Sequence, residues 1–159
     1  KIIVAMCKYN GIGFKNTMPW PSIHEDMKLF AKKTKGNNNN AVIMGRKTWN
    51  SLPKKPLSNR FNIILSKTLN INDEKTKTFD NVDKLIDYCK NSSFNEIWVI
   101  GGEEIYNLLL PYSDTIHVTY INEYYLCDTF FPNIPDSFLL SEKQELKSNL
   151  YVNIYKKQC

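Results

Sequence analysis

Val42-Ile43-Met44-Gly45-Arg46-Lys47-Thr48 indicates the fold class of this chain. The apolar run from Ala41 to Met44 is typical of a buried strand, and a short helix is expected at residues 46–51 directly after Gly45. A strand that leads straight into a helix is the repeating unit of α/β proteins. The start of such a helix offers free backbone amides, which together with two cations and a hydroxyl favour a bound phosphate.

The same pattern ends two further apolar runs. Residues 61–65 precede Ser66-Lys67-Thr68, and residues 96–100 precede Gly101-Gly102 and a helix predicted to reach Leu110. Because ligands of open α/β sheets gather at the carboxyl ends of parallel strands, three such ends favour one extended phosphorylated ligand. Each motif alone is also typical of a cap or turn with solvated charges. The chain has neither a Gly-x-Gly-x-x-Gly turn nor a Walker loop, so the common Rossmann and P-loop sites fit poorly.

The remaining pattern predicts a single α/β domain over residues 1–159. Ser22 is the expected cap of the first helix. Strands alternate with helices until late in the chain and then follow one another. This order predicts a mostly parallel eight-stranded sheet with an antiparallel C-terminal edge, flanked by about four helices. Besides the elements above, we expect strands at residues 1–7, 77–79, 115–121, 138–145 and 150–157, and helices at residues 22–35 and 82–89.

Composition and charge argue against several classes of function. The net charge of +5 forms no basic block, so no nucleic-acid partner is expected. No apolar run approaches the roughly 20 residues of a membrane span, and no membrane partner or signal peptide is expected. With four scattered cysteines and two histidines, we expect no metal site and reduced thiols in a cytoplasmic protein. The polar run Asn37–Asn40 is interpreted as a turn, and Cys7 as an inert core residue.

Asp26 is the strongest candidate for an acid that does chemistry. It follows a long loop, residues 8–21, whose glycines and prolines predict turns and a functional or mobile segment. Asp26 and Phe30 are four residues apart and share one helix face, whereas Glu25 pairs with Leu29. Apolar neighbours would desolvate the Asp26 carboxylate, raise its pKa and suit an amidine-like heterocycle. The alternative is a solvated first-turn residue that only favours the helix dipole.

Five motifs in order carry a resemblance to a known family. They are Gly11-Ile12-Gly13-Phe14-Lys15-Asn16-Thr17-Met18-Pro19-Trp20, Val42-Ile43-Met44-Gly45-Arg46-Lys47-Thr48-Trp49, Ile63-Ile64-Leu65-Ser66, Ile100-Gly101-Gly102 with Ile105-Tyr106, and Cys127-Asp128-Thr129-Phe130-Phe131-Pro132. Across essentially all of residues 1–159 the chain resembles dihydrofolate reductase. The resemblance implies that family's single-domain fold and reduction of 7,8-dihydrofolate to tetrahydrofolate for one-carbon and thymidylate metabolism. NADPH would deliver hydride to C6 while N5 gains a proton through water.

The resemblance also implies the substrate residues. Asp26 matches the acid that binds the pterin, Thr119 the threonine that hydrogen-bonds this acid, and Trp20 a residue of the loop that closes over the nicotinamide. Arg60 matches the arginine that clamps the α-carboxylate of the glutamate tail, a bidentate role that lysine fills poorly. The apolar wall of the folate slot is matched by Val4, Ala5, Met27, Phe30, Leu52, Leu57 and Ile100.

For NADPH, the resemblance implies contacts from the three strand ends and from the loop. Ser66 and Lys67 match contacts to the 2′-phosphate, which favours NADPH over NADH. Glu103 departs from the family, which usually has a small residue there, so its charge is expected to weaken cofactor binding unless it turns outward. The full implied set is Ala5, Ile12, Gly13, Asn16, Met18, Gly45, Arg46, Lys47, Thr48, Leu65, Ser66, Lys67, Ile100, Gly101, Gly102, Glu103, Glu104, Ile105 and Tyr106.

Two alternatives stay open from the sequence. A pyrimidine reductase of riboflavin synthesis shares the fold and NADPH, but it does not need the Trp20–Asp26 spacing, Arg60 and Thr119 together. A non-catalytic NADP-binding protein is disfavoured because every catalytic position is filled. The expected partners are dihydrofolate and antifolate inhibitors, and we expect a monomer unless the chain is part of a fusion with thymidylate synthase.

Overall fold

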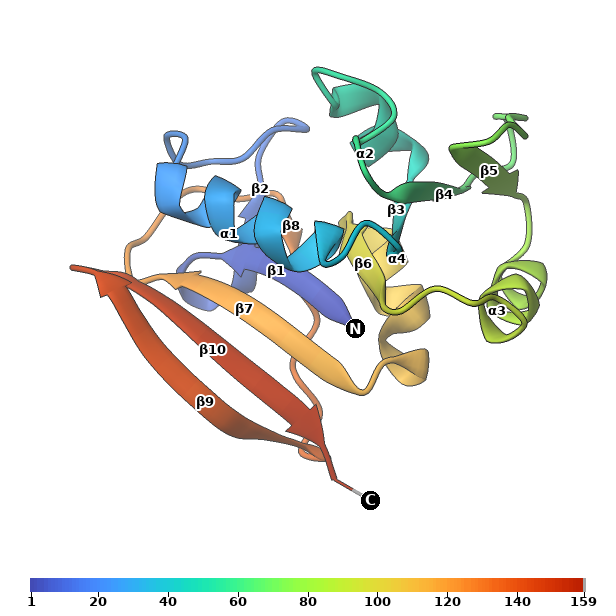
Figure 1. Cartoon of the computed structure of the whole chain (residues 1–159). Coiled ribbons are helices and arrows are strands. Elements are labelled where there is room, and N and C mark those ends of the chain that lie inside the picture. The colour runs from blue at the N-terminus through green and yellow to red at the C-terminus, as the bar shows by residue number, and fades with distance from the viewer. Residues whose placement is uncertain (159) are drawn as a thin grey trace.

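The computed structural model describes residues 1–158, and its centre is an eight-stranded sheet (Figure 1). The strand order is β5-β4-β3-β6-β1-β7-β10-β9; the first six strands are parallel and the last two pair antiparallel. The predicted architecture is therefore confirmed. The strands are β1 (Ile2–Met6), β3 (Ala41–Gly45), β4 (Phe61–Leu65), β5 (Thr76–Phe79), β6 (Ile97–Gly101), β7 (Thr115–Ile121), β9 (Phe138–Lys147) and β10 (Leu150–Lys157).

Four α-helices within residues 1–158 cover the two faces of the sheet: α1 (His24–Lys35), α2 (Arg46–Ser51), α3 (Val82–Lys90) and α4 (Glu103–Leu109). Side chains of a strand alternate between its faces, and the packing of β1 follows this rule. Ile2 and Val4 belong to the core cluster that contains Leu85 of α3 and Leu109 of α4. Ile3 belongs to the opposite cluster, against which Phe30 of α1 packs. Both faces of β1 are therefore buried.

Helix α1 begins later than predicted. Its N-cap is Ile23, which makes no side-chain capping bond, and the predicted Ser22 cap is wrong. The Ser22 hydroxyl instead contacts Met27 Sδ at 2.9 Å. Because the helix starts at His24, Ser22 stands too far upstream to reach the free amides of the first turn. Glu25 and Asp26 do lie in this first turn, where carboxylates favour the helix dipole.

The long loop between β1 and α1 contains more structure than the sequence predicts. Gly11–Gly13 form β2, which pairs antiparallel with β8 (Thr129–Phe130) in a small second sheet. A short 3-10 turn, Lys8–Asn10, precedes β2. Gly11 is needed because a Cβ there would lie 2.3 Å from Cys127 Sγ. The loop is thus anchored at its base by a strand far away in the sequence.

Cys7 and Asn40 are both buried in the structure, one as predicted and one against the prediction. Cys7 is fully buried, as expected of a core residue, and its Sγ lies 3.7 Å from Cys127 Sγ. Cys7, Cys89 and Cys127 are free thiols, whereas Cys159 lies outside the described residues. Asn40 was expected to belong to a polar turn. It is instead buried, donates to Thr34 O and accepts from Glu96 N, so it joins the end of α1 to the start of β6.

Two absences complete the description of residues 1–158. No helix in this range is both long and apolar enough to cross a membrane. The same residues contain no cluster of histidine, cysteine or acidic side chains that would suit a metal ion.

Candidate active site

Asp26 faces β7 from the first turn of α1. Burial raises the pKa of its carboxyl above the ordinary value, while a hydrogen bond from Thr119 and the nearby charge of Lys33 act in the opposite direction. Thr119 is itself buried at the centre of β7. A partly desolvated carboxyl beside a buried hydroxyl is suited to bind a ligand that offers N–H donors.

Glu25, the neighbouring acid, has a different environment. Its carboxylate forms an ion pair with Lys147 of β9, with 2.8 Å between Oε2 and Nζ. The Lys147 ammonium lowers the pKa of Glu25 below its ordinary value. The two adjacent acids therefore have pKa values shifted in opposite directions, and the raised one is the predicted candidate Asp26.

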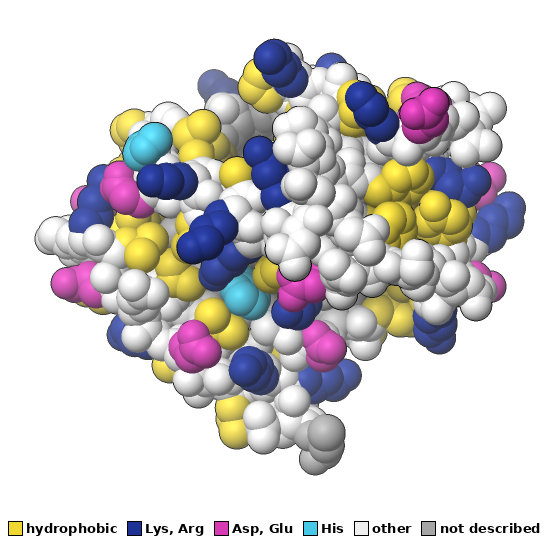
Figure 2. Space-filling view, in the orientation of Figure 1, with side chains coloured by type: hydrophobic (Ala, Val, Ile, Leu, Met, Phe, Trp, Pro, Cys, Tyr) yellow, Lys and Arg dark blue, Asp and Glu magenta, His cyan; other side chains and the backbone are white. Residues whose placement is uncertain are grey.

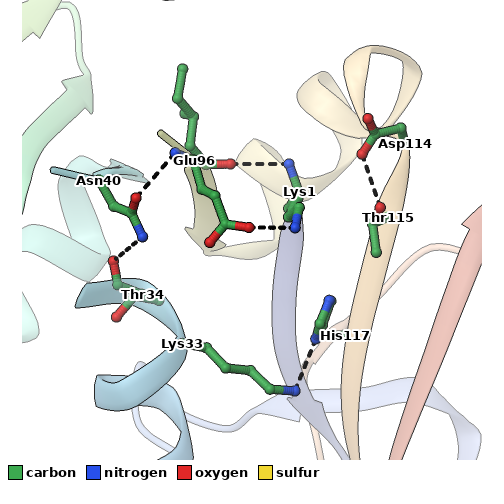
Figure 3. A network of polar contacts seen from close by, with 9 residues as sticks. Lys1, Lys33, Thr34, Asn40, Glu96, Asp114, Thr115 and His117 are labelled. Atoms are coloured by element: carbon green, nitrogen blue, oxygen red, sulfur yellow. Dashed lines mark hydrogen bonds and ion pairs between the residues drawn. The ribbon is translucent and has the colours of Figure 1, made fainter. Parts of the chain in front are cut away.

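Lys33 and His117 lie further along the same helix-strand contact (Figure 3). Lys33 Nζ is 2.9 Å from His117 Nδ1, which must accept this bond from the ammonium. Burial and the charge of Lys33 lower the pKa of His117 to about 4, so the ring is neutral at physiological pH. The edge of Trp98 packs on this ring at 4.9 Å between centroids. The sequence analysis missed this pair because its members come from separate elements.

Arg60 is positioned by Thr34, another residue that the sequence analysis missed. The Arg60 guanidinium donates from Nη1 to Thr34 Oγ1 at 3.0 Å and from Nε to Ser58 O at 2.8 Å. The Thr34 hydroxyl is fully buried and in turn donates to Phe30 O at 2.7 Å. Asn40 holds the Thr34 carbonyl (Figure 3). A chain of hydrogen bonds therefore fixes the guanidinium near the C-terminal half of α1.

The apolar wall predicted for the folate slot is only partly assembled by the structure. Phe30, Leu52, Leu57 and Ile100 pack against one core cluster, and Met27 lies nearby on α1 with about half its surface exposed (55%). Val4 is a correction: it packs in the cluster on the opposite face of the sheet. Ile3 belongs to the Phe30 cluster instead, because neighbouring strand residues point to opposite faces. Ala5, two residues on, packs near Trp20.

The three strand ends predicted to bind phosphates lie side by side. Strands β4, β3 and β6 are consecutive in the sheet, and Gly45 at the end of β3 is in register with Leu65 of β4. Met44 pairs with Gly101 of β6. A Cβ on Gly45 would lie 2.8 Å from Ile105 Cγ1, and one on Gly102 would lie 3.7 Å from Thr48 Oγ1. The start of α2 and the turn before α4 thus form one continuous edge.

The cationic side chains at this edge are exposed to solvent. Arg46, Lys47 and Lys67 are exposed, and Figure 2 shows Lys and Arg side chains spread over the face that carries α1 and α2. Exposed cations beside strand ends and a helix start are suited to bind an extended polyanion. The geometry therefore combines an edge that is suited to a long anionic ligand with a partly buried acid on α1.

Comparison with known proteins decides the family. A sequence model described as dihydrofolate reductase matches residues 1–157. The chain belongs to the dihydrofolate reductase family. It is 36% identical to the dihydrofolate reductase of Drosophila melanogaster over 150 residues, covering 86% of this chain and 81% of that protein. It is 34% identical to the Ureaplasma parvum enzyme, covering 98% of this chain and 95% of that protein.

Membership in the dihydrofolate reductase family establishes the reaction. The chain is an oxidoreductase that reduces dihydrofolate to tetrahydrofolate with a nicotinamide cofactor. This result decides between the two enzyme hypotheses in favour of dihydrofolate reductase. The chain is also 36% identical to a bifunctional dihydrofolate reductase-thymidylate synthase of Arabidopsis thaliana, covering 86% of this chain and 27% of that protein.

Some family positions have structural partners of their own. The Ser66 hydroxyl accepts from the backbone N–H groups of Thr68 and Leu69, at 3.2 and 3.1 Å, so it already stabilises a turn. Tyr106 is buried, and its hydroxyl lies 2.9 Å from both Ile3 O and Ile100 O. Burial raises the Tyr106 pKa, so the phenol stays protonated and donates to these carbonyls. Tyr106 therefore joins β1 to β6 beneath the cofactor edge.

The loop of residues 14–21, which the resemblance predicts to close over the nicotinamide, has one half-exposed and one buried hydrophobic residue. Met18 is about half exposed (49%), whereas Trp20 is 5% exposed and packs edge-on against Tyr125. Between them and β2, Lys15 and Asn16 have positive φ values of 49° and 64°. Asp128 fixes this turn: its carboxylate accepts from Lys15 N and its own N–H donates to Gly13 O, both at 2.9 Å.

Glu103 turns towards β8. Its carboxylate accepts the backbone N–H of Phe130, a contact between residues 27 positions apart. Glu104, its neighbour in the first turn of α4, is exposed. The structure therefore answers the question raised by the departure at Glu103: the side chain is bonded to the segment that supports the loop.

Proposed function

We propose that the chain uses NADPH to reduce 7,8-dihydrofolate at C6, with protonation at N5. The observation that carries this proposal is the partly buried Asp26 carboxyl, which faces Thr119 of β7 and lies on the same helix as Thr34, the residue that holds Arg60. Asp26 would accept hydrogen bonds from the amino group and ring nitrogen of the pterin. The same carboxylate oxygens would accept hydrogen bonds from antifolate inhibitors with an amidine-like face.

The two charged groups are spaced for an elongated substrate. Asp26 and Thr34 are eight residues apart on α1, which at 1.5 Å per residue is about 12 Å along the helix axis. Arg60 is bonded to Thr34 at the far end of this interval. A pterin held at Asp26 would therefore lie with its tail directed towards the guanidinium, which would bind the α-carboxylate of the glutamate. Phe30 and its apolar neighbours lie between these ends.

The residues at the neighbouring edge fit NADPH. When bound, NADPH supplies the hydride for the reduction. Arg46, Lys47 and Thr48 would hold its pyrophosphate side, and Lys67 with Ser66 would hold the 2′-phosphate that distinguishes NADPH from NADH. Gly101 has φ of 128° and a Cβ there would lie 3.3 Å from Tyr106 Oη, so the backbone at this turn stays bare for a ligand to approach.

The chain's own residues would then control the proton and the water. Its raised pKa gives Asp26 a stronger hold on a proton than an ordinary aspartate has. Because Asp26 would bind the far side of the pterin, water is the carrier of the proton to N5. The loop of Met18 and Trp20 would exclude bulk water while the reactants are aligned.

One assay tests this proposal. Purified protein is mixed with 7,8-dihydrofolate and either NADPH or NADH, and consumption of the reduced cofactor is followed by its absorbance. We expect turnover with NADPH and a much higher KM for NADH. Binding of NADPH without any turnover at saturating dihydrofolate would overturn the proposal. Equal KM values for the two cofactors would overturn the assignment of Ser66 and Lys67 to the 2′-phosphate.

A further inference from the structure

Glu103 connects the proposed cofactor edge to the small sheet at the base of the loop of Met18 and Trp20. It begins α4 directly after the Gly101-Gly102 turn, at the proposed cofactor edge. Its carboxylate accepts the N–H of Phe130 in β8. β8 pairs in turn with β2, which leads into the loop of Met18 and Trp20. One side chain therefore joins the cofactor edge to the base of this loop.

The Phe130 N–H can bond to Glu103 because neighbouring N–H groups of this segment, and not this one, bond to the loop. The N–H groups on one side of the segment are used by the loop: Asp128 N donates to Gly13 O at 2.9 Å, and Phe131 N donates to Asn10 O at 2.8 Å. The Phe130 N–H is directed to Glu103 instead. Such an amide at the edge of a two-stranded sheet otherwise bonds only to water, so the carboxylate adds a fixed partner.

A second contact ties the same segment to α4. The Phe131 ring packs edge-on against Tyr106 with 5.1 Å between centroids. Tyr106 is itself bonded to the carbonyls of Ile3 and Ile100, so it is rigidly placed. Two successive residues of the β8 segment thus contact α4, one through its ring and one through its backbone. Glu103 supplies the polar half of this attachment.

We propose that Glu103 is a positioning residue, whose carboxylate oxygen holds β8 and thereby the β2–β8 sheet in the arrangement that allows the loop to close. Its negative charge has the opposite effect on the cofactor, because a carboxylate near the pyrophosphate repels it. The hydrogen-bond acceptor favours closure and the charge disfavours cofactor binding. This inference rests on the proposed use of NADPH at the Gly101-Gly102 edge.

Two variants separate the acceptor from the charge. Glu103→Gln keeps an acceptor oxygen and removes the charge, whereas Glu103→Ala removes both. We expect Glu103→Ala to slow single-turnover hydride transfer by roughly tenfold, the size of one hydrogen bond to a charged group. Glu103→Gln should lose no more than about twofold in this rate and should bind NADPH several-fold more tightly. KM for dihydrofolate should change little in either variant. Asp136→Asn, which removes an exposed carboxylate elsewhere, is the matched charge control.

Hydrogen exchange of the Phe130 amide provides a readout that does not depend on turnover. We expect this amide to exchange roughly tenfold faster in Glu103→Ala than in Glu103→Gln or the unaltered chain. Equal hydride-transfer rates in the Ala and Gln variants would overturn the proposal, because the charge alone would then explain Glu103. Unchanged Phe130 exchange in Glu103→Ala would also overturn it. If the unaltered chain shows no turnover, the proposed function fails, while the exchange experiment still tests the attachment of β8.

Discussion

The proposed substrate half and the proposed cofactor half of the site differ in how their charged groups are held. Asp26, Arg60 and Lys33 are partly buried, and each has a side-chain partner. Asp26 faces Thr119, Arg60 donates to Thr34, and Lys33 donates to His117. Arg46, Lys47 and Lys67 at the cofactor edge are exposed. The proposed substrate half is therefore preorganised by the protein, whereas the proposed cofactor half presents exposed cations at the strand ends. Removing a substrate-side group should produce the larger and more specific effect.

Among the expected changes in KM, the largest comes from Arg60. Arg60→Ala should raise KM for dihydrofolate by about 100-fold, because a bidentate partner of the tail carboxylate is lost. KM for NADPH should change little. Arg46→Ala, on the cofactor side, should show the reverse selectivity with a smaller change of about tenfold in KM for NADPH. Steady-state kinetics with each substrate varied in turn measures both. Parallel changes in the two KM values for Arg60→Ala would contradict the division of the site into halves.

Thr34 tests whether the substrate half is preorganised. Thr34→Val removes the hydroxyl that accepts from Arg60 and keeps the shape of the side chain. We expect KM for dihydrofolate to rise by roughly three- to tenfold, with kcat nearly unchanged. Thr34→Ser retains the hydroxyl and is the control. If the Val and Ser variants have the same KM, Arg60 does not depend on this support.

Ionic strength should distinguish the halves without any substitution. Raising it from about 0.01 M to about 0.15 M shortens the Debye length from roughly 30 Å to roughly 8 Å and screens exposed charges most. We expect the dissociation constant of NADPH to rise several-fold, and that of dihydrofolate to rise less. Titration of each ligand at the two salt concentrations provides the comparison. A stronger salt dependence for dihydrofolate would count against the contrast.

The smallest expected effect concerns stability and His117. The folded pKa of His117 is about 4, below the ordinary value of 6.5, so the folded state resists protonating this ring. Its contribution to stability is present above pH 6.5 and is lost as the pH falls towards 4. After allowance for solvent screening, the loss should be on the order of 1 kcal/mol. His117→Gln, which does not titrate, should flatten this part of the unfolding free energy against pH. An unchanged pH profile would show that the Lys33–His117 pair does not titrate as described.

The sequence was informative where a feature depends on neighbours along the chain. Apolar runs ending in Gly45, Ser66 and Gly101 correctly predicted strands β3, β4 and β6, and their order in the chain predicted the parallel sheet. The helix face shared with Phe30 made Asp26 a candidate, and the spacing from Trp20 in the family resemblance selected it over Glu25, whose carboxylate pairs with Lys147. The strand inferences need only periodicity and the rules of strand-helix connection.

The sequence was uninformative where a feature depends on contacts between distant segments. No local pattern in residues 8–21 reveals that β2 pairs with β8, because the partner strand is more than 100 residues away. The roles of Thr34 and His117 likewise depend on Arg60 and Lys33 from other elements. Val4 was misplaced by a shift of one residue, which in a strand exchanges one face of the sheet for the other.

The pH dependence of turnover in Asp26→Asn, beside Glu25→Gln, tests the central claim most directly. We predict that Asp26→Asn lowers kcat near neutral pH by about 10²–10⁴-fold and that the loss shrinks at low pH, where substrate arrives already protonated. Glu25→Gln should remain within about threefold of the unaltered chain, since it loses only an exposed ion pair with Lys147. Equal losses in the two variants, or a loss in Asp26→Asn that does not vary with pH, would contradict the assignment of Asp26 as the acid of the site.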